Sequence, residues 1–187
     1  DTALAVPTIQ HATAEMEARS ARYDYVAMLQ PTSPLRTPAD LVEALTRLVA
    51  EGADGIISVV DVDNWHPMKM KRIRDGLLED YEASPVENPP RQSLPPVYMV
   101  NGAIYATRRD MLMAGGSFKG RRCLAHVMPP ERSVNIDSEA DFWVAERTLA
   151  PNAGVPASNA ALQKVYEAAH AGGGFFTFPT DDVTREV

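Results

Sequence analysis

Polar side chains that could bind a small ligand stand where apolar runs of the sequence stop. Gln30 and Ser33 follow the apolar run at residues 23–29, and Asn101 stands beside Gly102 within a second apolar stretch. Open α/β sheets bind ligands at the carboxyl ends of their strands. A glycine within a strand also allows a ligand or a backbone to approach closely. The sequence therefore predicts a loop at the carboxyl end of a strand and, at Gly102, a place where a ligand or backbone can come close.

A short basic segment could receive an anionic ligand. Its members are His66, Lys69, Lys71, Arg72 and Arg74. The whole chain carries a formal net charge of −7, which disfavours nucleic acid as the main partner because phosphate-backbone binding needs a broad basic surface. A small anion needs only a local basic pocket. The alternative interpretation of this segment is a solvated charged loop.

The composition is typical of one globular domain. The 187 residues are 45% hydrophobic and 23% charged, enough to bury a substantial core. The single cysteine, Cys123, rules out an internal disulfide framework and favours a reducing compartment, so we expect a cytoplasmic protein. No run approaches the roughly 18 apolar residues that span a bilayer, so we expect no membrane partner.

Two strand-like runs flank a helix with clear start signals. Residues 23–29 and 56–60 are apolar and typical of buried strands. Between them, Thr37, Pro38 and Asp40 mark a capped helix start that leads into an apolar stripe. This βαβ pattern predicts an α/β fold with a mostly parallel sheet and a right-handed crossover. Residues 6–22 have helical spacing and should cover one face of that sheet.

The regular pattern lapses in two places. Residues 61–96 are rich in proline and basic residues, and a long excursion of this kind usually serves function or a partner. Strand-like residues return at 97–106, and Ser138 with Asp141 predicts the capped start of a last helix. We therefore assign residues 1–150 to one α/β domain and residues 151–187 to a tail or linker.

Three stretches together resemble the acylneuraminate cytidylyltransferase family, the CMP-N-acetylneuraminic acid synthetases. They are LQPTSPLR at 29–36, RQSLPPVYMVNGAIY at 91–105 and ERSVNIDSEADF at 131–142. The segment SVVDVDNWHPMKMKRI at 58–73 is similar to the family's HP-x-K region. The resemblance implies a Rossmann-like fold of the nucleotide-diphospho-sugar transferase type. It also implies transfer of CMP from CTP to an acidic nine-carbon sugar, sialic acid or a related nonulosonic acid, with release of pyrophosphate.

The resemblance assigns catalysis to Asn135 and Asp137. The family uses a D-I-D pair of carboxylates to hold Mg²⁺ against phosphate oxygens, and Asp137 is the implied metal ligand. Asn135 replaces the first carboxylate with an amide, so the pair has one negative charge fewer and should hold the cation less tightly.

The resemblance also assigns substrate binding, to Gln30, Ser33, Lys69, Arg91, Asn101 and Tyr105. The guanidinium of Arg91 suits the carboxylate of an acidic sugar because it can pair with both oxygens. For Ser33 the alternative is a hydroxyl that holds its own loop. For Tyr105 it is an aromatic ring packed in the sheet.

Family members are homodimers in which this excursion reaches into the neighbouring subunit. The resemblance thus implies a homodimer, with the 61–96 excursion as the dimerisation element and either Lys69 or Phe118 serving the partner's site. Full-length members begin with a loop of the type ARxGSK that cradles the CTP triphosphate. No such loop occurs here, so we expect the CTP-binding segment to lie outside this sequence.

Two alternatives stay open at this point. A related CMP-sugar synthase for an eight-carbon acidic sugar would keep CTP and the metal but have a shorter sugar pocket. The other alternative is a non-catalytic remnant or binding module. It is favoured by Asn135, which replaces a carboxylate, and by the absence of the triphosphate loop from this sequence.

Overall fold

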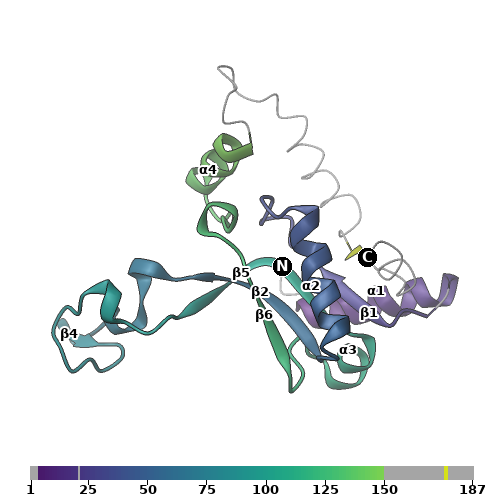
Figure 1. The fold of residues 1–187 in the computed structure, drawn as a ribbon, viewed down its shortest axis with the longest axis horizontal. Coiled ribbons are helices and arrows are strands. Elements are labelled where there is room, and N and C mark those ends of the chain that lie inside the picture. Colours follow the sequence, from purple (N-terminus) through teal and green to yellow (C-terminus); the bar gives the residue numbers. More distant parts are fainter. Residues whose placement is uncertain (1–3, 21, 150–174, 177–187) are drawn as a thin grey trace.

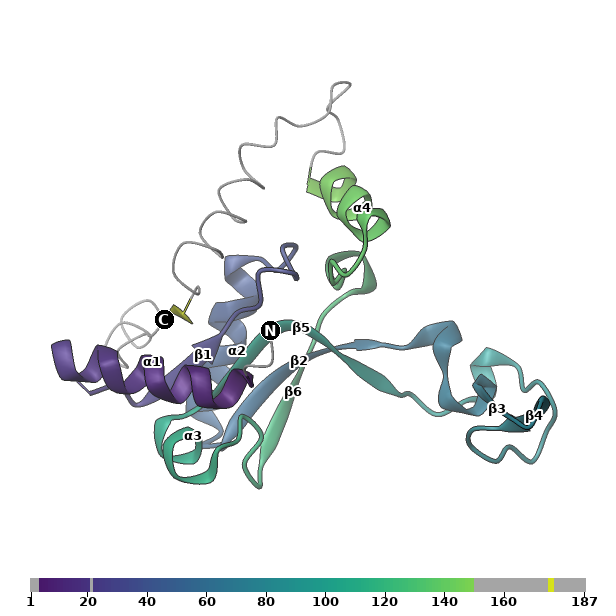
Figure 2. The same ribbon diagram turned by 180° about the vertical axis from the view of Figure 1, so that it is seen from behind.

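A computed structural model describes residues 4–20, 22–149 and 175–176. A twisted sheet carries helices on both faces, and a long two-stranded arm projects from it (Figures 1 and 2). Among the described residues, no helix is both long and apolar enough to cross a membrane.

The main sheet has the strand order β6-β2-β5-β1-β7. Its strands are β1 (Tyr25–Met28), β2 (Gly55–Asp61), β5 (Tyr98–Arg108), β6 (Cys123–Val127) and the two-residue β7 (Phe175–Phe176). Strand β5 pairs antiparallel with both β1 and β2, β7 pairs antiparallel with β1, and only β2 and β6 pair in parallel.

The prediction of a mostly parallel sheet is therefore wrong. Strands β1 and β2 do run in the same direction, as a βαβ unit requires, but β5 lies between them and runs the opposite way. The excursion after β2 contains no crossover helix, and it returns the chain as a long hairpin in which Asp61 pairs with Tyr98. A hairpin return produces antiparallel pairing.

Helix α2 (Pro38–Ala50) covers one face of the sheet. Thr37 caps it as predicted: the Thr37 hydroxyl accepts from the Asp40 N–H, and the Asp40 carboxylate accepts from the Thr37 N–H. Ala44, Leu45 and Leu48 then pack against buried residues of β1, β2 and β5. The cap and the apolar stripe together set where the helix begins and which side it buries.

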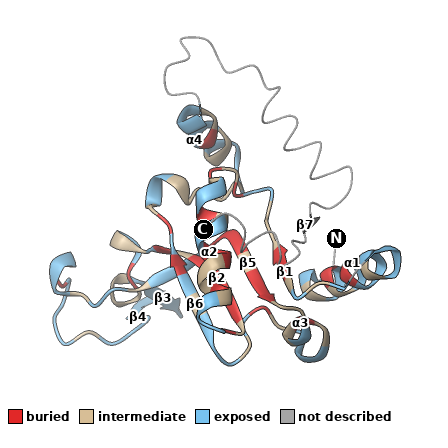
Figure 3. Cartoon of the chain, turned by 45° about the vertical axis from the view of Figure 1, so that its right-hand side comes forward, coloured by how far each residue is buried: buried red, intermediate tan, exposed pale blue. Residues whose placement is uncertain are grey.

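The opposite face carries α1 (Ala5–Arg19) and α3 (Arg109–Gly115). Ile9 of α1 and Leu112 of α3 are buried with Val26 and Phe118 in a second apolar cluster. Glu17 forms a two-point ion pair with Arg109, both distances being 2.6 Å, which ties α1 to α3. The elements thus form three layers around β1 and β5, and Figure 3 shows the buried residues of the sheet along β2, β5 and β1.

The excursion projects from the ends of β2 and β5 (Figure 1). It holds short 3-10 turns at Asp63–Trp65, Pro67–Lys69 and Arg91–Ser93, and a hairpin of β3 (Lys71–Arg74) and β4 (Leu77–Asp80). Every residue from 70 to 83 is exposed. After β6, a 3-10 turn, η4 (Pro130–Arg132), leads to α4 (Glu139–Leu149). Apart from residues 175–176, the predicted tail lies outside the described residues.

Candidate functional site

Segments from three parts of the chain meet at the carboxyl end of β1. The loop after β1 supplies Gln30 and Ser33, β5 supplies Gly102, and the segment after η4 supplies Asn135. A Cβ added at Gly102 would lie 2.4 Å from Gln30 Oε1 and 2.8 Å from Ser33 Oγ. Gly102 also has φ +78°, which side-chain-bearing residues rarely adopt. Glycine is thus required both for the backbone conformation and for the close approach of these polar groups.

Ser33 connects the three segments. Its hydroxyl is buried and lies 3.0 Å from the Asn101 carbonyl oxygen and 3.3 Å from Asn135 Oδ1, so its single proton is shared between these acceptors. Arg36 holds the loop from behind, donating to the carbonyls of Gln30 and Ser33 at 2.8 and 2.7 Å. Burial lowers the pKa of Arg36. These hydrogen bonds hold the loop to β5, to Arg36 and to the segment that carries Asn135.

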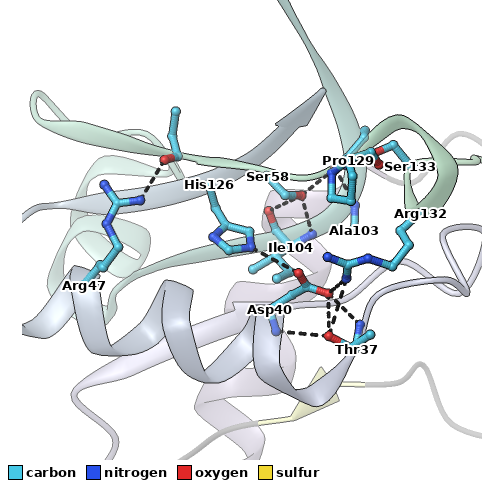
Figure 4. A network of polar contacts seen from close by, with 12 residues as sticks. Thr37, Asp40, Arg47, Ser58, Ala103, Ile104, His126, Pro129, Arg132 and Ser133 are labelled. Carbon is cyan, nitrogen blue, oxygen red and sulfur yellow. Dashed lines mark hydrogen bonds and ion pairs between the residues drawn. The ribbon is translucent and has the colours of Figure 1, made fainter. Parts of the chain in front are cut away.

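Asn101 lies under this cluster within a buried hydrogen-bond network. Its Oδ1 accepts from Ser58 Oγ at 2.6 Å, and its Nδ2 donates to Ser133 Oγ at 2.9 Å. The β2–β5 register shifts at Ser58, and the Ile104 N–H donates to Ser58 Oγ at 2.7 Å. Figure 4 shows Ser58 and Ser133 in this network. In this structure the Asn101 side chain joins β2, β5 and the turn after η4.

Asn135 and Asp137 stand at the outer side of the cluster. Asn135 Nδ2 donates to Asp137 Oδ2 at 2.7 Å, while the Asp137 side chain is exposed to solvent. The next residues begin α4: the Ser138 N–H donates to Asp141 Oδ2 at 2.8 Å, and hydrogen bonds from Ser138 lower the pKa of Asp141. The capping role predicted for Asp141 is confirmed. Asp137 therefore presents its carboxylate just before a helix start.

The Asn135–Asp137 pair offers a metal ion one protein carboxylate, that of Asp137. Among the described residues, no group of three or more His, Cys, Asp or Glu side chains could hold a metal. Mg²⁺, however, often takes only one or two carboxylates and completes its shell with water and substrate phosphates. The Asp137 carboxylate is exposed and accepts a hydrogen bond from the Asn135 amide at one oxygen, so it is a candidate for this second type of site.

Arg91 and Lys69 lie in the excursion, apart from the cluster around Ser33. Arg91 Nε lies 2.5 Å from Asp63 Oδ1, and both residues line a hollow of about 420 Å³ whose lining comes entirely from residues 61–97. His66, buried in the same hollow, accepts from the Met68 N–H at 3.1 Å. Lys69 is half-buried in the adjacent 3-10 turn. Among the described contacts, none joins Arg91 to Asn101.

Tyr105 faces the other side of the sheet. Its ring meets Phe118 edge-on, with centroids 5.9 Å apart and planes at 62°. It packs against the cluster that contains Ile9 and Leu112, and burial raises its pKa. This packing favours the structural interpretation of Tyr105, while its substrate role stays a prediction.

Sequence reasoning missed several residues that hold the site together. Ser58 and Ser133 contribute side chains to the network around Asn101, and Arg132 contacts Asp40, the residue that helps to cap α2. Arg132 and Ser133 are adjacent polar residues in the 131–142 stretch, and this position was the sequence feature that could have pointed to them. Their partners are far away in the sequence and could not be deduced from local pattern.

A larger hollow, of about 510 Å³, lies at the opposite end of β1. Its lining residues are Arg22, Tyr23, Asp24, Tyr25, Arg108, Arg109 and Asp110. Two of its arginines are already paired, Arg108 with Asp110 and Arg109 with Glu17. We place the candidate site at the Ser33 end of the sheet, because the segments at 29–36, β5 and 131–142 meet there.

Comparison with known proteins finds similarity along most of this chain. The post-translational flagellin modification protein B of Campylobacter coli is 26% identical over 147 residues, covering 78% of this chain and 62% of that protein. N-acylneuraminate cytidylyltransferase A of Danio rerio is 29% identical over 135 residues, covering 72% of this chain and 31% of that protein. N-acylneuraminate cytidylyltransferase of Streptococcus agalactiae serotype V is 31% identical over 118 residues, covering 62% and 28%.

No family model matches the sequence. The chain spans less than two thirds of the length of each of these relatives.

Proposed function

Because the chain is a distant homologue of N-acylneuraminate cytidylyltransferases and of a flagellin modification protein, we propose that it forms part of a nucleotidyltransferase. The proposed reaction transfers CMP from CTP to an acidic nine-carbon sugar and releases pyrophosphate. In this reaction a sugar hydroxyl attacks the α-phosphorus of CTP, and the bond to the leaving pyrophosphate breaks. Such transfers depend mainly on positioning and on stabilisation of negative charge.

One observation carries the proposal. The loop at 29–36, strand β5 and the segment at 131–142 are far apart in the sequence, yet Ser33 contacts both of the others at 3.0 and 3.3 Å. These are the segments whose residues resemble the cytidylyltransferases. They meet at the carboxyl end of a strand, where open α/β sheets bind ligands.

The side chains have separate proposed tasks. Gln30 and Ser33, whose side chains lie against Gly102, orient the sugar. Asp137 holds Mg²⁺, which neutralises negative charge on the phosphate oxygens when it is bound. Asn135 keeps the Asp137 carboxylate oriented through its 2.7 Å hydrogen bond.

Arg91 and Lys69 are proposed to bind the acidic group of the sugar from the excursion of a second subunit. Large apolar residues at the hairpin are exposed to solvent. Their exposed fractions are 77% for Ile73, 68% for Leu77, 70% for Leu78 and 57% for Tyr81. A surface of this kind, projecting from the sheet, fits burial in a homodimer.

The chain contains a single cysteine, Cys123, and this favours the cytoplasm as its compartment.

The test is pyrophosphate release by the protein that contains this chain. We expect release only when CTP, Mg²⁺ and N-acetylneuraminic acid are all present, and little with N-acetylmannosamine, which lacks the carboxylate. GTP in place of CTP tests the choice of nucleotide. Calorimetric titration with the acidic sugar measures the sugar site separately from turnover. Absence of both sugar binding and pyrophosphate release with every acidic sugar tried would refute the proposal.

A further inference from the structure

The segment at 130–138 carries Asn135 and Asp137 but lies largely at the surface. Residues 132–136 are only half-buried, and Asp137 is exposed. Apolar burial therefore contributes little to its placement. Polar contacts to other elements must decide where its side chains point.

The first of these contacts joins Arg132 to Asp40 at the start of α2. One nitrogen of the guanidinium contacts Asp40 Oδ2, and the Asp40 side chain is only 7% exposed. Behind it, His126 Nε2 lies 3.5 Å from Asp40 Oδ1 (Figure 4). Burial opposes ionisation of Asp40, but hydrogen bonds from Thr37 and Arg132 outweigh it and lower its pKa to about 2. Arg132 thus meets a carboxylate that is ionised and fixed in place.

Two further contacts hold the same segment. Ser133 Oγ accepts from Asn101 Nδ2 at 2.9 Å, and the Ile136 N–H donates to the Thr32 carbonyl at 2.7 Å. Arg132 lies at one end of this series, and Asn135 and Asp137 lie at the other. A change at Arg132 would therefore be transmitted along a short stretch of backbone to the Asn135–Asp137 pair.

We infer that Arg132 is a positioning residue: its ion pair with Asp40 anchors the 130–138 segment to α2 and so sets the orientation of Asn135 and Asp137. Insofar as it concerns Mg²⁺ and turnover, the inference rests on the function proposed above. Arg132 itself touches none of Gln30, Ser33 or Asp137 among the described contacts.

A purely structural role of Arg132 in capping α2 can be separated from this one. The cap is complete without Arg132, because Thr37 and Asp40 exchange hydrogen bonds of 2.7 and 3.3 Å with each other. Arg47 offers a matched control at the other end of the same helix: its Nη1 donates to the Ala125 carbonyl of β6 at 3.1 Å. Removing either guanidinium deletes one tie between α2 and another element, but only Arg132 leads to Asn135.

The experiment compares Arg132→Gln, Arg132→Lys and Arg47→Gln by amide hydrogen exchange. We expect Arg132→Gln to reduce the protection of the Ile136 amide by about tenfold or more. The Ile104 amide, which donates to Ser58 in the core, should keep its protection and serves as the internal reference. Arg47→Gln should leave both amides unchanged, and Arg132→Lys should restore part of the protection of Ile136.

The second readout is the Mg²⁺ concentration that gives half-maximal pyrophosphate release. It should rise in Arg132→Gln with the KM for the sugar unchanged, whereas a loss of stability alone would not move it. Unchanged protection of Ile136, or an equal loss at Ile136 and Ile104, would overturn the inference. A selective loss of protection at Ile136, in a protein that never transfers CMP, would support the anchoring role of the Arg132–Asp40 pair. It would refute the proposed reaction instead.

Discussion

The end of the sheet near Ser33 and the projecting excursion differ in how far their polar side chains are buried and bonded within the chain. At the sheet end, Ser33 and Asn101 are 1% and 3% exposed, and their polar groups are bonded to other parts of the same chain. In the excursion, residues 70–83 are all exposed, and the paired side chains of Arg91 and Asp63 are 62% and 43% exposed. Removing the partner of a buried polar group lowers the free energy of unfolding strongly, whereas an exposed ion pair contributes little to it.

The difference teaches which predicted residues this chain holds in place by itself. Gln30, Ser33, Asn135 and Asp137 are positioned by contacts within the chain. Arg91 and Lys69 stand on an arm whose apolar residues lack cover among the described parts of this single chain. Changes at the sheet end should therefore act on chemistry and stability, and changes on the arm should act on sugar affinity and assembly.

The largest effect is expected from Asp137→Asn. Asn135 is already an amide, so this change leaves the pair without a carboxylate, and turnover should fall by about 100- to 1,000-fold. The free energy of unfolding should hardly change because Asp137 is exposed. Steady-state kinetics over a range of Mg²⁺ concentrations measure the effect. Glu139→Gln, which removes an exposed carboxylate two residues away, is the control and should retain turnover.

The second effect is on stability and concerns Asn101→Ala. The change removes the partner of both Ser58 and Ser133, so the free energy of unfolding should fall by about 2 kcal/mol. Urea titration followed by circular dichroism measures it, with Arg91→Ala as the comparison from the arm. A loss below about 0.5 kcal/mol for Asn101→Ala would show that the network at the sheet end is not what stabilises it.

The third effect is a pH dependence caused by Asp40. Its pKa is lowered to about 2 in the folded chain from 3.8, so ionised Asp40 contributes stability above about pH 4, and this contribution is lost as the pH falls through 2. The difference in unfolding free energy between the wild type and Asp40→Asn should shrink by about 2 kcal/mol between pH 5 and pH 2. Urea titrations at several pH values check this, and a difference that stays constant with pH would contradict it.

A smaller effect is expected from Arg91→Ala on the arm. Loss of the guanidinium should raise the KM for the acidic sugar by about tenfold and leave the KM for CTP unchanged. Stability should change little, because the Arg91 side chain is 62% exposed in its pair with Asp63. Equilibrium binding of each substrate separates affinity from turnover. An unchanged affinity for the sugar would remove Arg91 from the anion site.

The smallest effect on folding is expected from Leu78→Ser at the hairpin. Leu78 is 70% exposed, so the unfolding free energy of the single chain should change by less than about 0.5 kcal/mol. The proposed dimer, by contrast, should dissociate at higher protein concentration than the wild type. Sedimentation at several concentrations tests this, with Glu82→Gln, at another exposed position of the excursion, as the control. A wild-type chain that is monomeric at all concentrations would refute the proposed dimer.

Much of the local structure could be predicted from sequence. The Thr37–Asp40 cap, the strands around 25–28 and 55–61, and the Ser138–Asp141 helix start all follow from short-range chemistry. The position of Gln30 and Ser33 after a buried strand was likewise visible. These features depend on residues a few positions apart, which is the range over which capping, periodicity and turns act.

The sequence by itself determined these elements, the resemblance to cytidylyltransferases and the polar residues at the ends of its strands. Only the tertiary structure decided that β5 lies between β1 and β2, which made the sheet mostly antiparallel. It alone brought Arg132 to Asp40, 92 residues away, and turned the Tyr105 ring toward Phe118. The physical reason is that strand order and buried polar pairs depend on which distant surfaces can be desolvated together. The local sequence pattern does not specify which distant segments these are.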